Sequence, residues 1–187
     1  HDRGVVLRRR HEFWRLRPDI LVSVMPSQQV ADITALGIDL AIRAAKGEPS
    51  WPGLDAELLV ESDVIAVGAP EMITDDMPPL DRLPWIWSEG VAHEEASIKA
   101  FGVDPARVRN ADLGSPFLQI AAARRGLGLA FSPEITVRED IEAGYLRRVP
   151  VPSPFTTRYY IVTAKGPVRP QAAVFIDWLK RALRGVQ

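Results

Sequence analysis

Few residues in this chain could do covalent chemistry, and none has the partners that such chemistry needs. His93 opens a His-Glu-Glu run like that of a zinc-protease helix, but Ser97 stands where the second histidine ligand would be. Ser115 follows a glycine but lacks the second glycine of a nucleophile elbow, and Pro116 removes a backbone N–H that an oxyanion hole would use. The chain has no cysteine, which excludes thiolate metal sites and cysteine nucleophiles. We therefore expect no catalysis, no metal and no cofactor.

A glycine pair offers the one hint of nucleotide binding. Gly126 and Gly128 resemble part of a dinucleotide-binding loop, but they follow a predicted helix and open a predicted strand. Pyrophosphate binding needs the reverse order. We interpret Gly126 as the end of the helix and Gly128 as a point of close strand approach.

The composition is that of an ordinary water-soluble domain. Of the 187 residues, 47% are hydrophobic and 25% are charged, and the net charge is −1. The basic run at residues 8–10, extended by Arg15 and Arg17, would spread around a helix as a solvated face, so direct DNA binding is not expected. No apolar run approaches the roughly 20 residues that span a bilayer, and residues 1–4 lack a secretory signal. The sequence thus favours a cytoplasmic location.

Hydrophobic periodicity places helices and strands in alternation at the start of the chain. Val6 and Phe13 lie two helical turns apart, Pro18 ends that helix, and Gly37 ends the next one. This order is typical of α/β proteins with a parallel sheet. The predicted elements are helices over residues 5–17 and 30–36 and strands over residues 20–25 and 38–43.

The remaining elements are mostly short. Residues 57–69 form an apolar stretch that is long for one strand. Ser115 is available to cap a helix with Pro116 in its first turn, and Phe175, Trp178 and Leu179 give the last helix one apolar stripe. The predicted strands cover residues 57–69, 85–87, 108–111, 127–131, 146–149 and 158–163, and the predicted helices cover residues 92–101, 116–125, 135–143 and 170–183.

Several segments, taken in order, make the chain resemble the effector-binding domain of LysR-type transcription regulators. The match runs over nearly the whole chain, and its order and spacing carry more weight than any one piece. Within the family, the segments at residues 51–54 and 153–155 look most like the glycine-cleavage-activator branch. The matching segments lie at residues 13–20, 37–43, 51–59, 119–130, 143–146, 153–162 and 175–179.

The resemblance implies an α/β fold of two Rossmann-like lobes, the type 2 periplasmic-binding-protein fold, joined by two crossing strands. Lobe I would comprise residues 1–63 and 157–187, and lobe II residues 64–156. The crossings would lie near residues 62–66 and 156–160. A small-molecule effector would bind in the cleft between the lobes.

One departure concerns the start of the chain. The family has a strand before the first helix, whereas this sequence starts at the helix, so we expect that lobe I lacks its first strand here and that preceding residues supply it. The family's N-terminal helix-turn-helix domain is also absent. DNA binding is therefore expected only of an intact protein that carries that domain.

By position in the family, the expected ligand contacts come from both lobes. In lobe I these are Ser27 and Gln28, which an ordinary turn would explain equally well, and Arg43, whose guanidinium suits a carboxylate. Arg43 would otherwise be a charge at a strand end, paired with Asp39 or Glu57.

Lobe II is expected to contribute residues at the end of a strand and at the start of a helix. They are Trp87, Ser88 and Glu89, whose strand should point its carboxyl end at the cleft, and Ser115. Trp87 would serve as a flat wall, with a core tryptophan as the alternative, and helix capping is the alternative for Ser115.

Effector binding is expected to shift the lobes and thereby the homodimer or homotetramer that presents the DNA-binding heads. In the family, a helix of one lobe packs beside a helix of the other lobe in the partner subunit. Here these helices would be residues 5–17 and 116–125. No membrane partner is expected.

Two other functions remain open at this point. A periplasmic solute-binding protein of an ABC transporter would share the fold, and an upstream signal peptide rather than a helix-turn-helix would indicate it. An enzyme on this fold, such as a dehydratase of prephenate-like acids, would need a catalytic group that we do not find.

Overall fold

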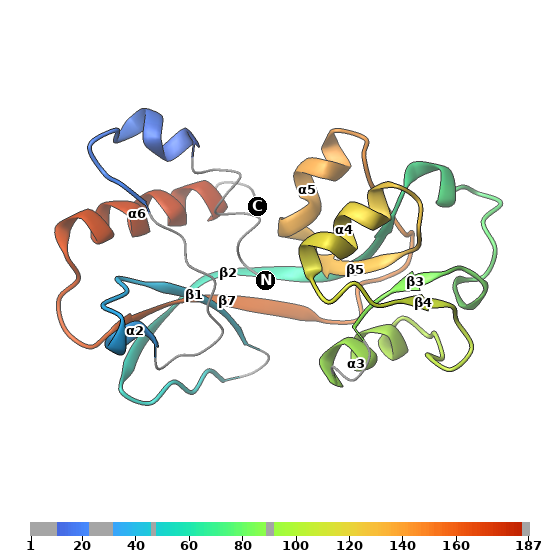
Figure 1. The fold of residues 1–187 in the computed structure, drawn as a ribbon, viewed down its shortest axis with the longest axis horizontal. Helices are drawn as coiled ribbons and strands as arrows, with labels where there is room; N and C mark the ends of the chain where they lie inside the picture. Colours follow the sequence, from blue (N-terminus) through green and yellow to red (C-terminus); the bar gives the residue numbers. More distant parts are fainter. Residues whose placement is uncertain (1–10, 23–31, 46–47, 89–91, 185–187) are drawn as a thin grey trace. The chain divides into compact units, whose positions relative to one another are not determined.

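The computed structural model describes residues 11–22, 32–45, 48–88 and 92–184 (Figure 1). The chain divides into two compact units. Unit 1 comprises His1–Glu61 and Thr157–Gln187, and unit 2 comprises Ser62–Thr156. Within the described part, no helix is both long and apolar enough to cross a membrane.

One part of the core of unit 1 forms where an N-terminal helix meets the last helix, and another surrounds the buried residues Ile33, Ala41, Tyr160 and Val162. Residues 11–16 are helical, and their buried side chain, Phe13, packs against Phe175 and Trp178 with both ring centroids 5.2 Å away. These two aromatic residues belong to α6 (Pro170–Arg184), whose apolar stripe is buried as the sequence predicts. In Figure 1 the short blue helix lies beside the red α6.

In the described part of unit 1, the first strand pairs antiparallel with the last. β7 (Thr156–Ala164) lies between β1 (Ala41–Ala45) and β2 (Leu54–Gly68), and Arg43 of β1 stands opposite Tyr160 of β7. Among the described residues, the partner of β1 thus comes from the far end of the chain. The short α2 (Asp32–Ala35) precedes β1. Gly37, which has a φ of 62°, lies between α2 and β1.

Two ion pairs attach α6 and the loop before it to the rest of unit 1. Arg169 donates two hydrogen bonds to Asp39, at 2.8 and 2.6 Å, and these hold the pKa of the Asp39 carboxyl below its ordinary value. Lys180 pairs with Glu57 at 2.5 Å. Both acidic residues that could have neutralised Arg43 therefore have other partners.

The Arg169–Asp39 pair predicts a small, pH-dependent contribution to stability. A carboxyl whose pKa is lower in the folded than in the unfolded protein stabilises the fold above its unfolded pKa and loses this effect as the pH falls. Because the Arg169 side chain is 69% exposed, we expect Arg169→Gln to cost no more than about 1 kcal/mol near neutral pH. The difference from wild type should begin to shrink as the pH falls below the ordinary aspartate pKa of about 3.9, and it should vanish only below the lowered pKa of the folded protein. Urea denaturation at pH 7 and pH 3 measures this, and an equal loss at both values would contradict it.

Unit 2 has a helix-covered core on each face of its strands. On one face, α4 (Pro116–Arg124) and α5 (Glu134–Glu142) cover residues such as Ile65, Val67 and Ile86. On the other, α3 (Ala92–Ala100) contributes Ile98 to a cluster with Trp85 and Trp87, which we call the α3-side core. Figure 1 shows α4 and α5 on the side of the unit 2 strands opposite to α3. Successive strand residues thus point to opposite faces.

Strand pairing in unit 2 combines both directions. β5 (Ala130–Pro133) and β6 (Arg147–Arg148) pair antiparallel with β2, whereas β3 (Trp85–Ile86) and β4 (Asn110–Ala111) pair parallel. A parallel bridge joins Trp85 to Leu129. Among the described residues, parallel pairing is therefore found in these short stretches of unit 2.

The structure confirms that Gly126 ends a helix and that Gly128 is a point of close strand approach. Gly126 ends α4 with φ 79°, and its N–H donates to the Ala123 carbonyl at 3.0 Å. A Cβ on Gly128 would lie 2.9 Å from the Pro84 carbonyl oxygen, so no larger residue fits there without a backbone shift.

Most predicted elements exist, with shifted ends. Residues 20–22, predicted to start a strand, are not in one, and residues 23–25 lie outside the described part. β1 runs three residues later than the predicted strand at its start and two at its end, and β5 also begins three residues late. The expected missing strand concerns the first ten residues and anything before them, which the structure does not describe.

Candidate functional site

Two of the residues that the sequence singles out in unit 2, Trp87 and Ser88, lie at the carboxyl end of β3. Trp87 follows this strand, and its backbone N–H donates to the Asn110 side-chain oxygen at 3.0 Å. Its side chain is 2% exposed and packs in the α3-side core. Among the residues that the structure describes, its buried indole Nε1 has no hydrogen-bond partner, whereas Nε1 of Trp85 donates to the Leu80 carbonyl at 2.8 Å.

Ser88, Glu94 and Gln119 form a connected polar group, which we call the Ser88 cluster. The Ser88 backbone N–H donates to Glu94 Oε2 at 2.6 Å, and Gln119 Nε2 donates to the Ser88 hydroxyl at 3.2 Å. Glu94 and Gln119 are each only 4% exposed. A serine oxygen that accepts the amide hydrogen can still donate its own proton. The cluster can therefore present one oriented hydroxyl beside a buried carboxylate.

Ser115 immediately precedes the helix that carries Gln119. It has the extended backbone of an N-cap, with φ −149° and ψ 128°, but its hydroxyl makes no hydrogen bond to the helix. Capping, the alternative that the sequence offers for this serine, is thus wrong for its side chain. The Ser115 carbonyl accepts from the Gln119 N–H at 2.9 Å, so Ser115 lies one turn before the Ser88 cluster.

Arg43 lies in unit 1 and has no acidic partner among the residues that the structure describes. Its Nη1 donates to the neighbouring Ile42 carbonyl at 3.0 Å, and its Nε is buried with no hydrogen-bond partner in the described part of the chain. The predicted partners Asp39 and Glu57 bind Arg169 and Lys180 instead. A half-buried guanidinium with a free N–H is well suited to an anionic group, because it has already lost part of its hydration.

The predicted contacts divide between the units. Trp87, Ser88 and Ser115 belong to unit 2 and Arg43 to unit 1, while Ser27, Gln28 and Glu89 lie outside the described residues. Sequence reasoning missed Glu94, Asn110 and Gln119. Gln119 left a signal, because it shares the inward helical stripe of Ala122 and Ala123, where a glutamine is unusual.

In the part of the chain that the structure describes, no three histidine, cysteine, aspartate or glutamate side chains gather as a metal site would require.

The sequence and the fold were compared with known proteins. Residues 3–184 match the family profile described as the LysR substrate binding domain. The chain is 31% identical over 172 residues to the AhcY transcriptional activator HvrB of Rhodobacter capsulatus, covering 90% of the chain and 58% of HvrB. It is 26% identical over 179 residues to the transcriptional activator AmpR of Citrobacter koseri, covering 94% of the chain and 62% of AmpR.

Solved structures give the same fold. The effector domain of AmpR from Pseudomonas aeruginosa superposes with a TM-score of 0.71 at 24% identity, covering 98% of the chain and 92% of that domain. The CrgA regulatory domain from Neisseria meningitidis gives 0.74 at 22% identity, covering 96% and 92%. The predicted fold is therefore confirmed. The chain spans 58% and 62% of the lengths of the two activators.

Proposed function

The chain belongs to the LysR substrate-binding domain family, and we propose that it is the part of a LysR-type transcription regulator that senses a small-molecule effector. The observation that carries the proposal is the coverage of residues 3–184 by one family profile, together with 31% identity to a transcriptional activator. These relatives favour a regulator over the solute-binding protein of an ABC transporter, and a binding role over catalysis. The glycine-cleavage-activator branch stays a prediction.

The intact protein would bind DNA through an N-terminal helix-turn-helix domain and act in the cytoplasm as a homodimer or homotetramer. Support for self-association comes from large apolar side chains that are exposed on the two helices predicted to pair. Leu16 is 67% exposed, and Phe117 and Leu118 are 76% and 49% exposed. Exposed apolar side chains grouped at one end of a helix are typical of interfaces.

We propose Arg43 and the Ser88 cluster as effector contacts, and a carboxylate as the effector's charged group. The guanidinium of Arg43 is the reason for expecting a carboxylate on the effector, because the described residues around Arg43 leave the charge of the guanidinium unpaired. The Ser88 hydroxyl and the Gln119 amide are the reason for expecting a second polar group on the effector. Both can form hydrogen bonds, and both are held in place by buried neighbours.

Thermal-shift screening against amino acids, aromatic acids and other small carboxylates tests the proposal. We expect at least one compound to raise the unfolding temperature in a saturable manner. With that compound, Arg43→Ala and Gln119→Leu should each weaken binding by about 10-fold or more, the loss expected for a hydrogen bond to a charged or buried group. Arg107→Ala is a matched control, because this exposed arginine of unit 2 pairs only loosely with Asp104, at 3.7 Å.

Each outcome bears on a separate part of the proposal. Unchanged binding of a carboxylate by Arg43→Ala would refute the role of the guanidinium. Unchanged binding by Gln119→Leu would remove the Ser88 cluster from the site.

A further inference from the structure

We propose that the effector is an aromatic monocarboxylic acid without a charged amine, whose carboxylate binds Arg43 and whose ring lies against Trp51 and Tyr160. The inference rests on the proposed function, because it narrows the chemical class of the effector that Arg43 is proposed to contact. All three side chains belong to unit 1.

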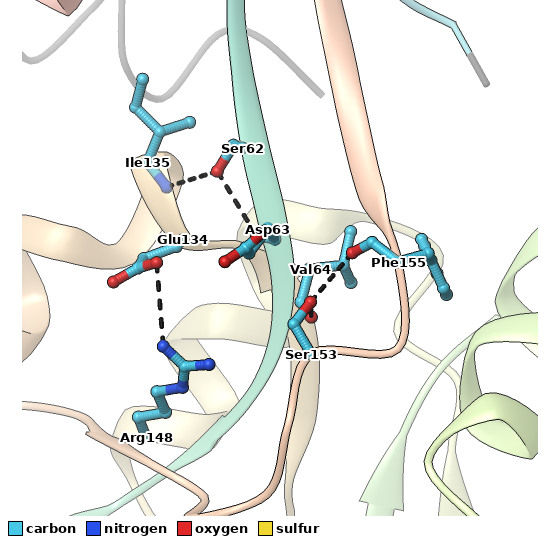
Figure 2. A network of polar contacts seen from close by, with 8 residues as sticks. All are labelled: Ser62, Asp63, Val64, Glu134, Ile135, Arg148, Ser153 and Phe155. Atoms are coloured by element: carbon cyan, nitrogen blue, oxygen red, sulfur yellow. Dashed lines mark hydrogen bonds and ion pairs between the residues drawn. The ribbon is translucent and has the colours of Figure 1, made fainter. Parts of the chain in front are cut away.

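Arg43 is an exception among the polar groups that the structure describes. Figure 2 shows the ordinary case beside β2, where the Ser62 hydroxyl accepts from the Ile135 N–H at 3.1 Å and the Ser153 hydroxyl donates to a β2 carbonyl at 2.7 Å. Of the side-chain nitrogens and oxygens buried in the described part of the chain, Arg43 Nε and Trp87 Nε1 have no hydrogen-bond partner. The indole is neutral whereas the guanidinium is charged, so the unsatisfied nitrogen of Arg43 is the costlier of the two.

The unpartnered Nε belongs to the edge of the guanidinium that binds carboxylates elsewhere in this protein. Arg169 and Arg17 each bind an aspartate through Nε and Nη2, at 2.8 and 2.6 Å to Asp39 and at 3.0 and 2.8 Å to Asp19. In Arg43 it is Nη1 that donates to a backbone carbonyl, at 3.0 Å. A carboxylate bound at two points along the Nε edge would therefore satisfy the buried nitrogen.

The surroundings of Arg43 on its face of the sheet are aromatic and apolar. Arg43 stands opposite Tyr160, and paired residues of antiparallel strands point to the same face. The Tyr160 ring packs against that of Trp51, with centroids 5.6 Å apart, and we call these two residues the aromatic pair. Ala41 and Ala45 flank Arg43 on the same face and belong to the same apolar cluster as the aromatic pair. These neighbours suit a ligand with a flat apolar body.

The charges near Arg43 favour a single negative charge on the ligand. Arg158 stands opposite Ala45, which makes it the diagonal neighbour of Arg43 on the same face. Arg158 Nε donates to Glu61 Oε2 at 2.7 Å, so its charge is already matched. The charge of Arg43 is left over. An ammonium group on the ligand would be repelled by the guanidinium groups, and a second carboxylate would lose its hydration against the aromatic pair.

Calorimetric titration with matched ligands tests this chemical class. Phenylpropionate and phenylalanine differ by the ammonium group, and glutarate has a second carboxylate and no ring. Benzoate and phenylacetate shorten the link between ring and carboxylate. We expect the tightest binder among the aromatic acids to bind at least about 10-fold more tightly than phenylalanine and glutarate, because of the repulsion and the lost hydration.

Two substitutions locate the ligand. Arg43→Ala should weaken the binding of the tightest aromatic acid by about 10-fold or more, and Trp51→Leu by about 3- to 10-fold, the range expected for one aromatic contact. Trp14→Leu is the matched control and should bind as wild type does, because Trp14 is also a half-buried tryptophan of unit 1 but lies in helical residues 11–16. If Trp51→Leu does not fold, the comparison of ligands with the wild-type chain decides.

The outcomes separate this inference from the sensing function. If phenylalanine or glutarate binds as tightly as the aromatic acids, the aromatic monoacid is refuted and the sensing function stands. Unchanged binding of the aromatic acid by Trp51→Leu, or an equal loss in Trp14→Leu, would overturn the placement of the ring. If no compound of the effector screen binds the chain, the sensing function itself fails, and the inference fails with it.

Discussion

Replacing Phe13 by alanine is expected to lower the free energy of unfolding of unit 1 by about 3–5 kcal/mol. The Phe13 side chain is fully buried, and both its ring neighbours, Phe175 and Trp178, belong to α6. It is the one fully buried side chain of helical residues 11–16. Loss of the ring would therefore remove the anchor of this helix as well as leave a cavity.

Chemical denaturation followed by circular dichroism measures this loss. Arg15→Ala is the control, because Arg15 is an exposed residue of the same helix and should change stability by less than about 0.5 kcal/mol. A Phe13→Ala variant within about 1 kcal/mol of wild type would show that the helix is held by other contacts.

Placing two charges on α4 is expected to dissociate the proposed dimer. Phe117 and Leu118 are large and exposed, whereas Gln119, Ala122 and Ala123 hold the opposite face of the helix in unit 2. The double variant Phe117→Glu with Leu118→Glu should therefore keep its fold. Its dimer dissociation constant should rise by about 100-fold or more, because apolar anchors at the centre of an interface carry most of its binding energy.

Light scattering over a range of concentrations measures the association. Leu58→Glu is the control, because Leu58 is an exposed apolar side chain, at 44%, that belongs to β2 and to neither of the two predicted helices. A wild-type chain that stays monomeric at high concentration, or a double variant that associates as tightly as wild type, would contradict the proposed pairing.

The local hydrophobic pattern of the sequence predicted most of the helices and strands, but it did not predict at which residue the hydrogen bonding of each strand begins. The predicted strand at residues 127–131 becomes β5 at Ala130–Pro133, because Gly128 lies against Pro84 and Leu129 pairs with Trp85 before the ladder to β2 starts. β1 is displaced for a related reason, since its register is set by β7, more than 110 residues later in the chain. Such registers depend on tertiary contacts that no local period contains.

The candidate site shows the same limit. Ser88 could be singled out because it follows a strand, but its partner Gln119 lies 31 residues away on a helix. The ion-pair alternative for Arg43 failed because Asp39 binds an arginine 130 residues distant. Sequence reasoning can select residue types at element ends, whereas their partners emerge only from the fold.

Calorimetric titration of the chain with the compound found by screening tests the central claim most directly. The account predicts saturable binding of one small molecule per chain, weakened by Arg43→Ala or Gln119→Leu and unaffected by Arg107→Ala. Failure of every amino acid, aromatic acid and small carboxylate to bind the folded chain would contradict the claim that this domain senses such an effector.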